Sequence, residues 1–389
     1  MSTERREFGP VQISKLVLTP FITDEKITHD LFTCPMEGKT WFYKQPSSSL
    51  ADEAAKKFRI LNEAISGVIA LILSKKGKSF STPQHRLVID ASQNPMGVLS
   101  EGITLERFDD NKLAMIKALT TSGLAEITAL SFFMKDPDAY NNIGHGESTT
   151  SPLARIDWGL SGYPTLEAMA YLTKGEENKL PSDKGAKIFD ITPTNILSFV
   201  MQPVTEIECH AHHVFTSASI KYLATFCAST KESESKLATD FFQKIFDTFH
   251  LITKELTSED FKRKIHDELG LGCLSDHDKM ICDQIIDQYI DSANLLSTTL
   301  KELSSKDSKG MEEIIAGVKA DIGPESSSPE VLSRLSPYRS PSGSDADDHP
   351  PALGGGGGGG GGGGPLYDPA LYRNSRSEPK TEPKTGPST

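Results

Sequence analysis

The sequence predicts an α+β fold in which a lobe of mixed strands and helices is followed by a mainly helical lobe. Short β-branched and aromatic runs alternate with helices up to about residue 165, whereas residues from about 190 to 305 have helical periodicity. The chain from Pro324 onward is rich in Pro, Ser and Gly and includes eleven consecutive glycines, Gly354–Gly364. Ordering such a segment costs more entropy than burial can return, so we expect residues 320–389 to be a disordered tail.

Composition excludes several classes of protein. The 389 residues carry a net charge of -12, which argues against a nucleic-acid partner. The five cysteines are scattered without CxxC spacing, which favours reduced thiols over a disulfide scaffold. No apolar run approaches the roughly 18 residues of a membrane-spanning helix. The charged first ten residues lack an apolar core, so we expect no secretory leader there.

The expected strands are short segments with high β-propensity. The Asn94–Pro95 step predicts a turn, so the strands on either side of it should form a hairpin. The strands we expect are Val11–Leu18, Thr40–Gln45, His85–Ala91, Met96–Ser100 and Leu153–Trp158.

A long helix is predicted between the second and third of these strands, over Leu50–Ser74. Its apolar residues recur at steps of three and four and form one stripe. Acidic residues in its first turn and Lys75 and Lys76 at its end match the helix dipole. Further helices are expected at Ser122–Met134, Val214–Phe226, Leu237–Leu256, Phe261–Leu269 and Met280–Leu303.

Four polar features follow one another along the chain. Each is common alone, because a strand lysine or a helix glutamate usually faces solvent and an Asp-rich loop is usually a turn. In this order they supply what phosphoryl transfer needs, which is positioning and charge neutralisation. The features are Lys44 in a strand, Glu63 in the following helix, a loop with Asp136, Asp138, Asn141 and Asn142, and Asp157 in an Asp-Trp-Gly step.

The chemistry of each group suits one part of that reaction. A lysine on a strand can hold nucleotide phosphates, and a helix glutamate can pair with it. A loop aspartate can accept the proton of the attacking hydroxyl, and an asparagine and a second aspartate offer Mg²⁺ the oxygen ligands it prefers. The interval from Asp136 to Asn141 is five residues, as in the kinase pattern HRDxxxxN.

These segments resemble a protein-kinase-like fold. More narrowly, they resemble the divergent kinase-like effectors that intracellular bacteria such as Legionella inject into host cells. The resemblance covers about Thr40–Phe199, half of the chain. It rests on Asn94–Ile103, similar to a PxGxxS hinge strand, on RILNEAISG, similar to the αC helix, on NNIG and ARIDWG, similar to the catalytic and metal loops, and on ITPTNILSF, similar to a TPTN-type segment.

The resemblance implies a bilobal fold with an N-lobe over residues 10–105 and a mainly helical C-lobe over 106–305. It makes Lys44 the phosphate-pairing lysine, Glu63 its partner and Asp157 a metal ligand. Either Asp136 or Asp138 would be the catalytic aspartate. Either Asn141 or Asn142 would be the metal asparagine; Asn142 precedes Ile-Gly as the family residue does, but lies only four residues after Asp138.

The same resemblance implies ATP and Mg²⁺ as cofactors and a host protein or a phosphoinositide as substrate. It further implies delivery into the host cytoplasm by a non-classical, type IV-like route, peripheral contact with a membrane and a host activating factor. The sequence departs from the family in having no glycine-rich loop before Lys44, no HRD and no APE segment. A pseudokinase or a non-catalytic helical interaction protein therefore stays the alternative.

A second group of metal-binding residue types is weaker. Cys209, His210, His212 and His213 lie within five residues, and zinc accepts such ligands. No clear third or fourth ligand is evident in the sequence, so we expect the start of a helix with solvated histidines, with a contact from the histidines to substrate or phosphate as the alternative.

Overall fold

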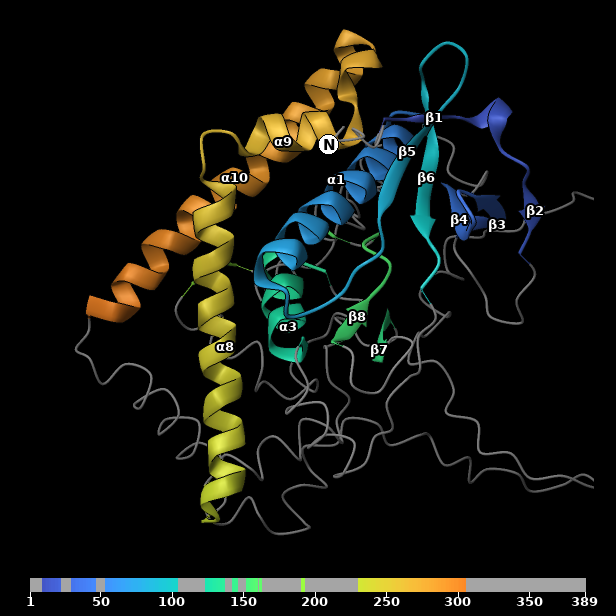
Figure 1. Cartoon of the computed structure of the whole chain (residues 1–389). Coiled ribbons are helices and arrows are strands. Elements are labelled where there is room, and N and C mark those ends of the chain that lie inside the picture. Colours follow the sequence, from blue (N-terminus) through green and yellow to red (C-terminus); the bar gives the residue numbers. More distant parts are fainter. Residues whose placement is uncertain are drawn as a thin grey trace, which may run out of the picture. The chain divides into compact units, whose positions relative to one another are not determined.

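A computed structural model of the chain describes residues 9–21, 29–46, 53–103, 123–136, 142–145, 152–159, 161–162, 190–192 and 230–305. All of them belong to the first of two compact units, Met1–Tyr338. The expected helix Val214–Phe226, the segment Cys209–His213 and the expected tail lie outside the described residues. The described part is an α+β fold with a six-stranded sheet, a two-stranded sheet and helices (Figure 1).

The large sheet pairs its strands in the order β1-β5-β6-β4-β3-β2. Only β1 and β5 pair in parallel, and the other neighbours are antiparallel. The hairpin predicted around Asn94–Pro95 is confirmed, because β5 and β6 pair across it. The strands are β1 (Val11–Gln12), β5 (His85–Ile89), β6 (Pro95–Glu101), β4 (Lys39–Pro46), β3 (His29–Met36) and β2 (Thr19–Pro20).

Several strand predictions differ from the structure. The segment predicted as one strand over Val11–Leu18 pairs as a strand only in β1, and a 3-10 turn, Ile13–Lys15, follows. Ile13, Leu16 and Leu18 pack against the small core on one face of the sheet without strand pairing, whereas Val17 is exposed. The sequence analysis missed β3, because Asp30 and Pro35 are poor strand formers. Glu37 and Gly38 have φ values of 56° and 74°, which suits the tight two-residue turn joining β3 to β4.

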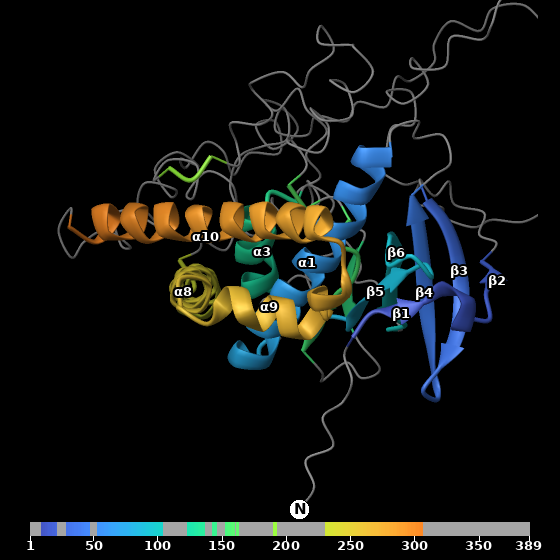
Figure 2. The same ribbon diagram turned by 90° about the horizontal axis from the view of Figure 1, so that it is seen from above.

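Helix α1 (Glu53–Gly77) lies between the sheet and a layer of C-terminal helices (Figure 2). It contacts β4, β5 and β6 on one side and α8, α9 and α10 on the other. Every residue from Ile60 to Ala70 is buried, so the single apolar stripe predicted for this helix was too narrow. Polar residues of α1 are buried as well, among them Asn62, Glu63 and Ser66.

The remaining helices agree closely with the predicted ones. α9 has the predicted bounds, and α8 and α10 begin five and four residues earlier than predicted. The expected strand Leu153–Trp158 ends at Arg155, because Asp157 has a left-handed φ of 58° that interrupts an extended chain. The elements are α3 (Leu124–Phe133), β7 (Ile143–His145), β8 (Leu153–Arg155), α8 (Glu232–Leu256), α9 (Phe261–Leu269), the 3-10 helix η5 (Leu271–Cys273) and α10 (Asp276–Ser305).

Most of the apolar side chains join one core. This core extends over α1, α3, α8, α9 and α10 and over the face of the sheet toward α1. A smaller core with Trp41 and Tyr43 covers the opposite face. None of the described helices is long and apolar enough to cross a membrane.

His85 is a buried polar residue between the sheet and α1. A Cβ atom on Gly67 would lie 2.4 Å from Cγ of the His85 ring, so only glycine allows this close approach. Nδ1 lies 3.0 Å from the carbonyl oxygen of Pro83. Burial, followed by the nearby charge of Lys44, lowers the pKa of His85 from its ordinary 6.5 to about 4.

Because His85 is buried in its neutral form, the free energy of unfolding should decrease as the pH falls from 6.5 to 4. Below pH 6.5 the unfolded chain takes up a proton that the folded chain refuses until about pH 4, so the free energy of unfolding decreases over this interval. The two pKa values differ by about 2.5, each unit corresponding to about 1.4 kcal/mol, so the expected loss is about 3 kcal/mol. Denaturant unfolding of the full chain at several pH values measures it.

The control is His250→Gln, which changes an exposed histidine on α8 and should leave the pH dependence intact. His85→Gln should flatten the slope between pH 6.5 and 4, whatever it does to the stability at pH 7. An unchanged slope in His85→Gln would show that other groups cause the pH dependence.

Candidate functional site

Strand β4 places Lys44 on the face of the sheet that α1 covers. Side chains of a strand alternate between its two faces. Trp41 and Tyr43 point into the small core on the far face, so Lys44 points toward α1. Its side chain is only 13% exposed.

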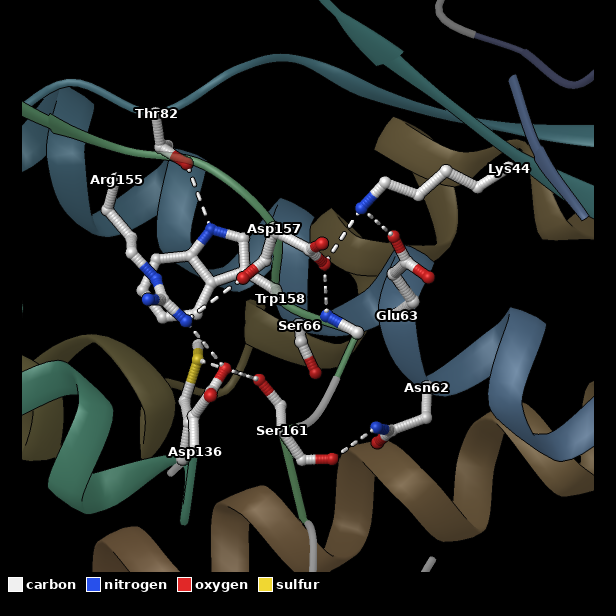
Figure 3. A network of polar contacts seen from close by, with 12 residues as sticks. Lys44, Asn62, Glu63, Ser66, Thr82, Asp136, Arg155, Asp157, Trp158 and Ser161 are labelled. Atoms are coloured by element: carbon white, nitrogen blue, oxygen red, sulfur yellow. Dashed lines mark hydrogen bonds and ion pairs between the residues drawn. The ribbon is translucent and has the colours of Figure 1, made fainter. Parts of the chain in front are cut away.

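Two carboxylates hold the Lys44 ammonium group (Figure 3). Nζ lies 3.0 Å from Oε1 of Glu63 on α1 and 2.7 Å from Oδ1 of Asp157. Burial alone would lower the pKa of Lys44, but the charges of Asp157 and Glu63 outweigh it and raise the pKa above its ordinary value. The amine is therefore a fixed positive charge.

Asp157 has an unusual backbone conformation. Its φ of 58° lies in the left-handed region, which Asp and Asn tolerate better than most residues. Its Oδ1 also accepts a hydrogen bond of 3.0 Å from the backbone N–H of Gly159. A Cβ atom on Gly159 would lie 3.1 Å from that oxygen and 3.2 Å from Oε2 of Glu63, so glycine keeps the two carboxylates close together.

A buried ion pair lies beside the lysine. Nη2 of Arg155 is 3.1 Å from Oδ2 of Asp136, and both side chains are fully buried. The same Nη2 donates a hydrogen bond of 3.0 Å to the backbone carbonyl of Asp157. The guanidinium carbon also lies 4.9 Å from the ring centre of Trp158. Arg155 thus ties the end of α3 to the segment that carries Asp157.

Further hydrogen bonds extend this network to α1 (Figure 3). Ser161 Oγ donates to Asp136 at 3.1 Å, and Asn62 Nδ2 donates to the Ser161 carbonyl at 2.6 Å. Trp158 Nε1 donates to Thr82 Oγ1 at 3.0 Å. The positions of Glu63 and Asp157 are therefore linked through buried polar contacts as well as through Lys44.

The structure brings together three of the residues selected from the sequence, Lys44, Glu63 and Asp157. Asp136 lies next to them but is 1% exposed and paired with Arg155. The carbonyl of Asn142 accepts a hydrogen bond of 2.9 Å from the N–H of Ile156, beside Asp157. Asp138 and Asn141 lie outside the described residues. The roles assigned to all these residues stay predictions.

The sequence analysis did not select Arg155 or Arg59. Arg155 stands among apolar neighbours in LARIDW, and a charged residue in such a run indicates a buried ion pair. Arg59 lies one turn before Glu63 on α1, and both line a hollow together with Lys44 and Gly159. Within the described ranges no three His, Cys, Asp or Glu residues are grouped as a metal site.

Comparison with known proteins gives distant structural similarity. No protein-family model and no curated protein matches the chain. Among solved structures, the Helicobacter pylori proinflammatory kinase CtkA aligns with 76% of this chain and 99% of its own, at 12% identity and a TM-score of 0.39.

Removal of Arg155 should destabilise the protein strongly. Arg155→Met leaves the carboxylate of Asp136 buried without its counter-charge, which costs about 3–5 kcal/mol in comparable buried pairs. The double variant Asp136→Asn, Arg155→Met removes both charges and should be more stable than Arg155→Met alone. Denaturant unfolding of the full chain measures both changes.

Arg263→Met is the matched control, because Arg263 lies on the exposed side of α9 and, in the described part of the chain, pairs with the solvent-accessible Asp260 and Asp267. It should unfold almost as the wild type does. Equal stabilities of the two Arg155 variants would contradict the dependence of Asp136 on Arg155.

Proposed function

We propose that the chain is an ATP- and Mg²⁺-dependent phosphotransferase of an atypical kinase type. The observation that carries this proposal is the Lys44 ammonium group held between Glu63 and Asp157. A fixed lysine beside a partly exposed carboxylate offers one contact for nucleotide phosphates and one for their metal ion. We also propose that the chain is two-lobed, with an N-lobe over residues 10–105 and a C-lobe over residues 106–305.

The residues present fit a magnesium nucleotide. Mg²⁺ in such sites takes one or two protein oxygens and completes its shell with phosphates and water, so a cluster of three protein carboxylates is not required. The Asp157 side chain is 33% exposed at the edge of the ion pair. The backbone carbonyl of Asn142 accepts a hydrogen bond from Ile156, the residue before Asp157. The bound ion would neutralise phosphate charge. Lys44 would orient the phosphates, and Glu63 would hold Lys44 in place.

The general base decides between turnover and mere binding. Asp136 is buried and its carboxylate accepts bonds from Arg155 and Ser161, which suits an anchor better than a base that meets an incoming hydroxyl. We therefore assign the base to Asp138. If Asp138 does not act as the general base, the same geometry favours the second candidate function, a pseudokinase that binds nucleotide without turning it over.

The acceptor is proposed as a host protein hydroxyl or a phosphoinositide. This assignment, the peripheral membrane contact, the host activating factor and the type IV-like delivery into the host cytoplasm rest on the sequence resemblance. The rival function is a non-catalytic helical interaction protein, which has no need for Lys44, Glu63 and Asp157 to converge.

Nucleotide binding tests the proposal on the full chain. ATP at about 100 times its Kd should raise the free energy of unfolding by about 2.7 kcal/mol, seen as a higher midpoint of thermal unfolding, and this increase should depend on Mg²⁺. Asp157→Asn should abolish the Mg²⁺-dependent part, because asparagine keeps the left-handed backbone conformation but loses the charge. Lys44→Met should weaken ATP binding with or without Mg²⁺.

Lys39→Met is the matched control, since Lys39 lies on the same strand but is 59% exposed and pairs with Glu101. It should bind ATP as the wild type does. If millimolar ATP left the unfolding midpoint of the wild type unchanged, the proposed function would be contradicted. ATP binding with no release of ADP or phosphorylated product would favour the pseudokinase.

A further inference from the structure

We propose that Arg59 is a phosphate-binding residue of this site and contacts the terminal phosphates of the nucleotide. The inference rests on the proposed function and adds a residue that the kinase resemblance does not supply. Arg59 precedes Glu63 by four residues on α1, so the two side chains lie on one face of the helix. Arg59 lines the same hollow as Lys44, Glu63 and Gly159.

The guanidinium group of Arg59 is uncommitted. No hydrogen bond or ion pair joins it to another group within the described part of the chain, although Glu63 lies one turn away. The neighbouring cations of α1 are engaged, since Lys56 pairs with Glu53 at 2.6 Å and Lys57 pairs with the buried Asp278 at 3.1 Å. A partly buried arginine left unpaired beside paired lysines is a donor available to a ligand.

An anionic ligand in this hollow needs a positive charge beyond that of Lys44. Lys44 is already balanced by Glu63 and Asp157, so its charge alone does not offset a polyphosphate. Arg59 supplies a second positive charge to the lining of the same hollow. The planar fork of a guanidinium matches phosphate oxygens with two parallel hydrogen bonds.

The sequence before Lys44 also explains why such a residue is needed. The segment Met36–Thr40 contains a single glycine, Gly38, and this glycine forms the tight turn between β3 and β4. A glycine-rich loop that would donate several backbone N–H groups to phosphates is therefore absent from the residues directly before Lys44. A side chain on α1 can take over part of that role.

The experiment compares nucleotides that differ in the number of phosphates. Isothermal titration of the full chain with ATP, ADP and AMP, all with Mg²⁺, is performed on the wild type, Arg59→Gln and Arg59→Lys. We expect Arg59→Gln to raise the Kd for ATP about tenfold, within the range of a hydrogen bond to a charged group. The Kd for AMP should change less than twofold, and Arg59→Lys should fall between the wild type and Arg59→Gln for ATP.

Lys56→Gln is the matched control, because it removes the same charge from the same helix at a residue already paired with Glu53. It should bind all three nucleotides as the wild type does. An ATP affinity of Arg59→Gln equal to that of the wild type would overturn the inference alone. Equal losses for ATP and AMP would also overturn it, and absence of nucleotide binding by the wild type would overturn the proposed function together with it.

Discussion

The ammonium group of Lys44 is the point on which the site depends. It joins strand β4 and the next element, helix α1, to the residues after β8, which come much later in the sequence. Two carboxylates as close together as Glu63 and Asp157 would repel each other in a partly buried environment without a cation between them. The lysine therefore both fixes the geometry and balances the charge of its two partners.

Each of these segments is also held by contacts of its own. Strand β4 lies inside the sheet between β6 and β3. Asp157 follows Arg155, whose buried guanidinium group holds its carbonyl. Helix α1 is fastened on its other side, because Ser66 Oγ lies 2.8 Å from the Tyr289 hydroxyl and Lys57 pairs with Asp278 on α10.

The C-terminal helices are consequently part of the framework of the site. Asp278 is fully buried, and Ser275 donates a hydrogen bond of 2.9 Å to its Oδ2, so its contact with Lys57 joins α10 firmly to the start of α1. Glu63 lies between this contact and the one made by Ser66 further along the helix. A displacement of α10 would therefore move the glutamate that holds Lys44.

The order of residues along the chain allowed the convergence of Lys44, Glu63 and Asp157 to be predicted, because each stands in a recognisable local context. The helical segments were also predictable from their periodicity. Strand β3 was not, since its stability comes from pairing with β4 and not from its own residues. The pairing of Arg155 with Asp136 is a tertiary contact, and no local pattern distinguishes an anchoring aspartate from a catalytic one.

Sequence also could not show that α1 is covered on both faces. An apolar stripe indicates one buried side, whereas Asn62 is buried next to Ser161 and Ser66 next to Tyr289 of α10, and both partners follow much later in the sequence. For the same reason Arg59 resembled an ordinary surface arginine until its neighbours in space were known. Local patterns located the participants, and tertiary packing determined their surroundings.

The most direct test of the central claim is a double-mutant cycle between Lys44 and Asp157. The free energies of unfolding of the wild type, Lys44→Met, Asp157→Asn and the double variant are measured without nucleotide at moderate salt. Direct contact predicts a coupling energy of about 1–3 kcal/mol, with the double variant less destabilised than the sum of the single variants. A coupling energy indistinguishable from zero would show that the lysine and the aspartate do not meet, and would contradict the site as described.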